Sequence, residues 1–202
     1  NLFKGLAPWM QRLPGGLIHV NVVGCALFAA ISGSSAATVA TVGKMSIPEL
    51  RKRKYPEKIL LGSLAGSGTL GLLIPPSIIL IIYGVTVQES IAKLFIAGII
   101  PGIMIALIFM SYVIVWSLIN KKSMPKSSEN SSFLEKVKKS KQLMPVVLLI
   151  LAVIGSIYTG IATATEAASL GVVGALILSF FQKSLTKETF KASLLGATKT
   201  SC

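Results

Sequence analysis

The 202-residue chain is too apolar for an ordinary soluble domain, with 52% hydrophobic residues, 13% charged residues and a mean hydropathy of +0.76. Soluble domains carry about a quarter of their residues as charged groups, so this composition indicates that lipid forms part of the solvent. The net charge of +13 would suit nucleic acid, but the basic residues lie in blocks between apolar runs, which favours orientation in a bilayer.

The first two apolar runs along the chain are both interrupted. The run 17–47 is broken at 32–35, and each limb is shorter than the roughly 20 residues of a spanning helix. It is either one broken span or a hairpin that enters and leaves from the cytoplasm, and basic residues on both sides favour the hairpin. The run 59–83 is long enough to span but contains several glycines and a Pro-Pro pair.

Three further runs, 94–119, 143–161 and 167–181, are predicted to be helices. The basic segment 44–58 separates the first two runs. The segment 120–142 is rich in serine, lysine and glutamate, and is predicted to be a solvated loop with a short amphipathic helix near 133–137.

The distribution of basic residues predicts the orientation. Placing 44–58, 120–142 and 182–191 in the cytoplasm puts most of the 20 basic residues inside and only Lys93 outside. The opposite orientation would violate the positive-inside rule. We therefore expect a multi-pass protein of the bacterial inner membrane.

The two interruptions are the places where chemistry is expected. Irregular backbone at membrane depth survives only where protein or a water-filled cavity satisfies its polar groups, and transporters use such breaks as ion and substrate sites. Pro75 and Pro76 lack an N–H, so the carbonyls of Gly71 and Leu72 lose their helical partners. Ile74 precedes a proline and is driven towards extended geometry.

Sodium is a hard cation that prefers oxygen ligands. The predicted sodium site consists of the hydroxyls of Ser32 and Ser35 with the carbonyls of Gly71, Ile74 and Pro76. Substrate or the sodium ligands are expected to contact Gly33, Ser34 and Thr69. The N-terminal end of the helix after Ser35 would attract a carboxylate.

The alternative interpretation of the breaks is a proline kink with small residues for close helix packing. The pairs Gly62-x-x-x-Gly66 and Gly98-x-x-x-Gly102 fit that interpretation. The pattern alone leaves both explanations open.

Two further polar residues lie beside or within apolar runs and need a separate interpretation. Glu166 borders an apolar run, either as a functional acid or, with Thr163 or Thr165, as a helix cap; the cap is favoured. His19 has no ligand-spaced neighbour and is interpreted as a hydrogen-bonded interior or interfacial histidine. No nucleophile–base pair, phosphate-binding loop or paired acids are found, so the sequence predicts no enzyme and no organic cofactor.

Several motifs in order resemble the large membrane subunit of tripartite ATP-independent periplasmic (TRAP) transporters. They are Ser32-Gly33-Ser34-Ser35-Ala36-Ala37, Ile47-Pro48-Glu49, Gly71-x-x-Ile74-Pro75-Pro76-Ser77, Leu94-Phe95-Ile96-Ala97-Gly98-Ile99-Ile100-Pro101-Gly102 and Thr163-Ala164-Thr165-Glu166-Ala167-Ala168. Thr38 and Ala164 depart from the family, which often has Asp and Pro at those positions.

This resemblance implies an all-α, elevator-type secondary transporter with inverted repeats, each with one re-entrant hairpin and one broken helix. It implies sodium-driven import of carboxylates such as C4-dicarboxylates or sialic acids. A periplasmic binding protein would deliver the substrate, and a small four-helix membrane subunit would stiffen the scaffold. Subunits of this kind are about twice as long, so this chain is expected to hold half of the transport site.

The expected division of the chain follows from these runs. Residues 1–58 hold an amphipathic arm, the hairpin and a basic linker; 59–119 a broken helix and a long helix; 120–142 a cytoplasmic loop; 143–202 the start of the second repeat. Two other functions stay open: a sodium/divalent-anion symporter that needs no binding protein, and a membrane scaffold that transports nothing.

Overall fold

The computed structural model describes residues 2–125, 144–181 and 184–201, and all regular elements among them are helices. The all-helical class predicted from the sequence is confirmed. The chain forms two compact units, Asn1–Met144 and Pro145–Cys202. The helices of the first unit are α1 (Leu2–Met10), η1 (Gly16–Ile18), α2 (His19–Ser32), α3 (Ser35–Lys52), α4 (Glu57–Gly68), η2 (Thr69–Leu72), α5 (Ile78–Thr86), α6 (Ile91–Ile119) and η3 (Lys121–Ser123).

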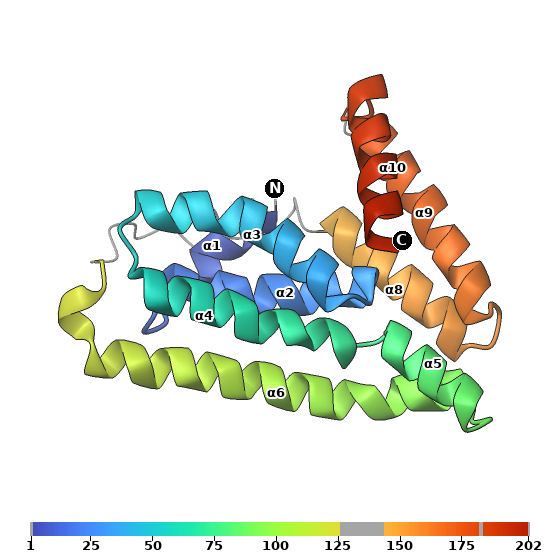
Figure 1. Ribbon diagram of the computed structural model, residues 1–202, viewed down its shortest axis with the longest axis horizontal. Coiled ribbons are helices and arrows are strands. Elements are labelled where there is room, and N and C mark those ends of the chain that lie inside the picture. Colours follow the sequence, from blue (N-terminus) through green and yellow to red (C-terminus); the bar gives the residue numbers. More distant parts are fainter. Residues whose placement is uncertain (1, 126–143, 182–183, 202) are drawn as a thin grey trace. The chain divides into compact units, whose positions relative to one another are not determined.

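Helices α2 and α3 form a helical hairpin, which confirms the predicted interruption at 32–35 (Figure 1). Helix α2 ends because Gly33 adopts a left-handed conformation with φ 59°, while its N–H still donates to the carbonyl of Ala29. Ser34 is extended and caps α3, its hydroxyl accepting from the N–H of Ala37 at 3.4 Å. Two residues are thus enough to reverse the chain.

The second interruption is also confirmed. Helix α4 ends at Gly68, the 3₁₀ turn η2 follows, and α5 starts only at Ile78, so the run 59–83 holds two short helices. Pro75 and Pro76 separate η2 from α5 because neither has an N–H to continue a helical ladder.

Helix α6 is the long helix expected at 94–119, and it begins slightly earlier, at Ile91, because the Ser90 hydroxyl caps it by accepting from the N–H of Lys93. By length and hydropathy, α6 and α9 (Ala164–Phe181) are the helices of the described chain that meet the criteria for a membrane span. Large apolar side chains cover the exposed surface of α6, as expected for contact with lipid or with further helices.

Helix α2 is the centre of the first unit, packed among α1, α3, α4 and α6. Val22, Cys25 and Ala29 are fully buried on it. His19 is also fully buried, with Nε2 2.8 Å from the carbonyl oxygen of Pro14, which confirms the hydrogen-bonded interior position. The first limb of the hairpin is therefore held by packing on several sides.

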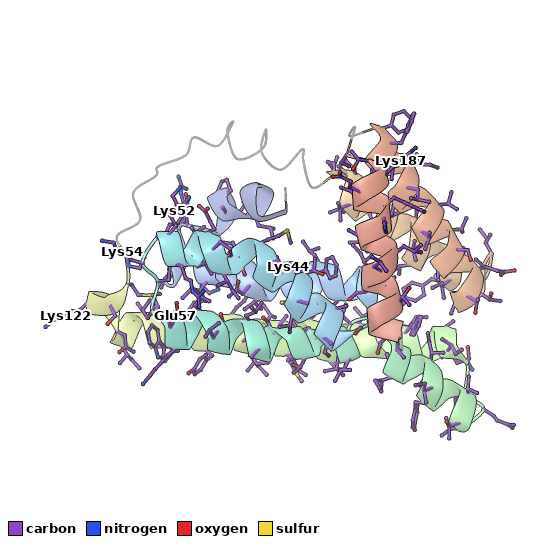
Figure 2. All side chains as sticks on the ribbon, turned by 45° about the horizontal axis from the view of Figure 1, so that its top comes forward. Lys44, Lys52, Lys54, Glu57, Lys122 and Lys187 are labelled. Carbon is purple, nitrogen blue, oxygen red and sulfur yellow. The ribbon has the colours of Figure 1, made fainter. Side chains whose placement is uncertain are left out.

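The basic segment 44–58 is mostly helical. Helix α3 continues to Lys52 with Pro48 inside it, and α4 starts at Glu57. Figure 2 shows Lys52, Lys54 and Lys122 at one end of the first unit, together with Glu57. This end therefore carries a concentration of positive charge.

The second unit contains α8 (Met144–Tyr158), α9 and α10 (Lys187–Ser201). The predicted helices 143–161 and 167–181 are found as α8 and α9, whereas α10 was not predicted as a helix. The predicted amphipathic helix near 133–137, and the loop around it from 126 onwards, lie outside the described residues.

Candidate functional site

The tip of the hairpin lies against the break between α4 and α5, and we call this place the crossing: residues 32–35 together with 71–77. The backbone N–H of Ile78 donates to the carbonyl of Gly33 at 3.4 Å. A Cβ on Gly33 would lie 2.8 Å from the carbonyl oxygen of Pro76. A Cβ on Gly71 would lie 2.8–2.9 Å from backbone atoms of Ser34 and Ser35. The two interruptions predicted from sequence therefore meet through their main chains (Figure 1).

Two glycines of α6 pack closely against the crossing. A Cβ on Gly98 would lie 3.0 Å from the carbonyl oxygen of Leu73, and one on Gly102 would lie 2.9 Å from Cγ1 of Ile74. The packing role expected for this glycine pair is thus confirmed. In the other pair, Gly66 packs on the ring of Phe109, but a Cβ on Gly62 would meet nothing within 4 Å, so the packing explanation is wrong for Gly62.

Four helix ends converge on the crossing. Helix α2 ends at Ser32, and α4 ends at Gly68, where a Cβ would lie 3.8 Å from the carbonyl oxygen of Ser35. Helices α3 and α5 begin there, at Ser35 and Ile78. C-terminal helix ends carry partial negative charge and attract cations, while N-terminal ends attract anions. The crossing therefore offers favourable potential to a cation and to a carboxylate within a few residues.

The hydroxyl groups of the hairpin tip differ in their partners. Among the described residues, the buried Ser35 Oγ has no hydrogen-bond partner. Ser32 Oγ lies 2.8 Å from Oγ1 of the fully buried Thr38 and donates to the carbonyl of Ser34 at 3.3 Å. Ser35 is thus the predicted ligand whose oxygen is left unsatisfied by the protein itself.

The residues that were predicted to supply carbonyl ligands differ in where they lie and in what they contact. The carbonyl of Pro76 faces Gly33, and Gly71 packs on the backbone of Ser34 and Ser35, so the fold brings both residues to the hairpin tip. The Leu72 carbonyl, expected to be freed by Pro76, instead accepts from Ser77 Oγ at 2.6 Å. The N–H of Ile74 donates to Leu70 O, and the Ile74 side chain packs on a buried apolar cluster.

Thr69 lies on the exposed surface, and its hydroxyl donates to the carbonyl of Gly66 at 2.7 Å. Sequence reasoning assigned no role to Ser77 of the crossing or to Thr38, which pairs with Ser32. Ser77 directly follows the two prolines, where a hydroxyl can replace a missing N–H, and that position was the available signal.

The donor set of the crossing fits sodium better than a divalent or transition metal. Its oxygens come from hydroxyls and carbonyls, all neutral, and one buried hydroxyl is unsatisfied. The described residues contain no group of three or more His, Cys, Asp or Glu side chains placed to hold a metal ion. A monovalent hard cation suits neutral oxygen ligands because it has less charge to neutralise.

Glu166 belongs to the second unit and caps α9. Its Oε2 accepts from the N–H of Thr163 at 2.8 Å and from the Thr163 hydroxyl at 2.9 Å, and Thr163 Oγ1 accepts from the N–H of Glu166. This reciprocal pair is a capping box. The cap interpretation, with Thr163 as the N-cap, is confirmed.

With this geometry established, comparison with known proteins identifies the class as a membrane transporter component. Residues 2–202 match the family model described as the DctM component of the tripartite ATP-independent periplasmic transporters. The chain belongs to this family, which consists of transporter subunits and not of enzymes. The resemblance noted from the sequence motifs is confirmed.

Similar curated proteins come from several bacteria. The chain is 38% identical over 170 residues to the C4-dicarboxylate TRAP transporter large permease protein DctM of Pseudomonas aeruginosa, covering 84% of this chain and 39% of that protein. It is 37% identical over 198 residues to the sialic acid TRAP transporter permease protein SiaT of Haemophilus influenzae, covering 97% and 32%. It is 38% identical over 180 residues to the ectoine TRAP transporter large permease protein TeaC of Halomonas elongata, covering 89% and 41%. The chain thus spans less than half the length of these relatives.

Proposed function

We propose that the chain supplies one half of the transport site of a sodium-coupled importer of organic carboxylates in the bacterial inner membrane. The hairpin α2–α3 would be re-entrant, opening to the cytoplasm, and the first unit would carry the moving part of an elevator-type transporter. A periplasmic binding protein would deliver the substrate, and a small four-helix membrane subunit would hold the scaffold. The chain division into 1–58, 59–119, 120–142 and 143–202 belongs to the same proposal.

The observation that carries the proposal is the unsatisfied hydroxyl of Ser35 at the meeting point of four helix ends. A buried hydroxyl without a partner costs about 1–3 kcal/mol, so a ligand that satisfies it gains that much in binding. Sodium would be held by Ser35 Oγ, Ser32 Oγ and the carbonyls of Gly71, Ile74 and Pro76. The ion supplies positive charge next to the carboxylate, and the protein's part is to position the oxygens.

The carboxylate is expected near the N-terminal end of α3, close to Gly33 and Ser34, with Thr69 at the rim. The names of the three relatives described above point to C4-dicarboxylate, sialic acid and ectoine, all of which carry a carboxylate. An organic carboxylate is therefore the substrate class proposed here.

Uptake into proteoliposomes tests this function. The full-length permease, its small subunit and its binding protein should accumulate a labelled carboxylate only under an inward sodium gradient, and potassium should not replace sodium. In detergent, sodium should raise the thermal midpoint of the permease relative to potassium at equal ionic strength. A membrane scaffold without transport would respond equally to both ions, and that result would reject the proposal.

A further inference from the structure

A hollow lies in the first unit, away from the crossing, where the chain passes from α1 to η1. Its volume is ≈ 550 Å³. The α1–η1 connection, the α3–α4 connection, the C-terminal end of α6 and η3 form its walls. The polar residues along it are Gln11, Arg12, Arg53, Tyr55, Ser117 and Lys121. We call it the basic pocket.

The chemistry of the basic pocket favours an anion. Arg12, Arg53 and Lys121 line it, and among the residues that the structure describes no carboxylate does. Arg53 donates from Nε to Glu49 at 2.9 Å, which leaves its remaining N–H groups available. Within the described part of the chain, no carboxylate lies within ion-pairing distance of Arg12 or Lys121.

Tyr55 adds a neutral donor to this set. Its oxygen accepts from the N–H of Leu17 at 3.1 Å, so the phenol proton is free to point into the pocket. Burial raises the pKa of the Tyr55 phenol above its usual value, and the group therefore keeps its proton at neutral pH. Two arginines, one lysine and a phenol form a donor set suited to phosphate oxygens.

The depth of the pocket matches the headgroup layer. Helix α6 has 29 residues, so it is about 43 Å long and exceeds the roughly 30 Å hydrocarbon core. Ser117 and Leu118, at its C-terminal end, line the pocket. The same end of the unit carries Lys52, Lys54 and Lys122 (Figure 2). Basic pockets between helices on the cytoplasmic side bind anionic headgroups.

An apolar groove lies further along α6, towards its middle. It has a volume of ≈ 290 Å³ and is lined by Val22, Gly62, Ser63, Ile108, Phe109, Tyr112 and Val113. The groove and the basic pocket are neighbours separated by a packed contact, since a Cβ on Gly15 of the basic pocket would lie 2.7 Å from Cγ1 of the buried Val113 of the groove. An acyl chain that leaves the pocket over this contact would reach the groove, which a soluble anion would not use.

We propose that the basic pocket binds the phosphate-bearing headgroup of an anionic phospholipid, with one acyl chain in the groove along α6. Arg12, Lys121 and Tyr55 contact the phosphate, and Arg53 is positioned by Glu49. This site is separate from the crossing and does not depend on the transport function.

Native mass spectrometry of the full-length permease in detergent tests the site, with dioleoylphosphatidylglycerol as the probe. Each neutralised charge is expected to weaken binding about fivefold, so Arg12→Gln/Lys121→Gln should weaken it about twenty-five-fold. The matched control Lys52→Gln/Lys58→Gln removes two exposed charges outside the pocket and should have little effect. Equal losses in both double variants would mean diffuse attraction and would overturn the proposal.

Two further arms identify the source of the phosphate. Dioleoylphosphatidylcholine should bind much more weakly, because its headgroup is neutral overall. Inorganic phosphate should displace phosphatidylglycerol only at far higher concentration, since it cannot occupy the groove. Displacement at equal concentrations would assign the pocket to a soluble anion and reject the lipid. If the double variant does not fold, Lys121→Gln alone, with its expected fivefold loss, decides.

Discussion

Ser35 and Ser46 are two residues of one helix that share an unusual state. Both lie on α3, and both have a buried hydroxyl without a hydrogen-bond partner among the described residues. They differ in place, since Ser35 lies at the crossing and Ser46 lies further along α3, towards its C-terminal end. This difference allows the effect of losing a buried hydroxyl to be separated from the effect of losing a sodium ligand.

Ser35→Ala in the full-length permease should raise the sodium concentration for half-maximal uptake about ten- to hundredfold. Losing one oxygen ligand to a cation costs about 1.5–3 kcal/mol, by analogy with hydrogen bonds to charged groups. Sodium-dependent uptake at varied sodium concentration is the measurement. Ser46→Ala should leave that concentration unchanged, and equal shifts in both variants would exclude Ser35 as a ligand.

Sequence reasoning at this scale succeeded where a residue has one dominant physical property. Prolines without an N–H placed the second interruption correctly, and the polar break at 32–35 in an apolar run placed the first. It could not foresee that Ser77 would satisfy the Leu72 carbonyl, or that Thr38 would pair with Ser32, because both depend on side-chain direction in three dimensions.

The element scale is dominated by the contact between η2 and the hairpin tip. This contact is made by backbone against backbone at Gly71, and no side chain separates the two segments. Apolar periodicity predicted the helices. It could not predict that the two interruptions would contact each other, because that contact follows from the packing of the helices around α2. Helix α10 was missed because its composition is largely polar and it lacks a continuous apolar run.

Gly71→Ala should destabilise the permease by about 1–3 kcal/mol, because the new methyl group would overlap the Ser34 backbone, which cannot move without shifting the tip. Gly62→Ala is the control. It lies in α4 with open space around it, so alanine should be neutral or stabilise by up to about 1 kcal/mol through helix propensity. Thermal unfolding in detergent measures both, and equal midpoints would contradict the close contact at Gly71.

At the scale of the whole molecule, the charge distribution predicts which side of the membrane each connecting segment faces. The basic residues beside the hairpin, Arg12 on one side and Lys52 on the other, are exposed, and Glu89 lies in the short connection between α5 and α6. A re-entrant hairpin puts the first two on the same side of the membrane, and a spanning α6 puts Glu89 on the opposite side.

Single cysteines test this arrangement in a background without Cys25 and Cys202. Arg12→Cys and Lys52→Cys should both react only after the cytoplasmic side is opened to a membrane-impermeant maleimide, while Glu89→Cys should react in intact cells whose outer membrane is permeable to the reagent. Reaction of Arg12→Cys from the periplasm would show that the run 17–47 crosses the membrane once.

The main-chain construction of the crossing has a consequence for how fast the proposed sodium ion would bind and be released. Flexible side chains lose rotational freedom when they close around a ligand, whereas backbone carbonyls and a serine on the first turn of a helix have little freedom left to lose. Ordering therefore contributes little to the entropy of binding at this place, and few rearrangements stand between the occupied and the empty states. At the proposed sodium site, this preorganisation would favour rapid loading and release of the ion, which is the kinetic behaviour that repeated cycling demands.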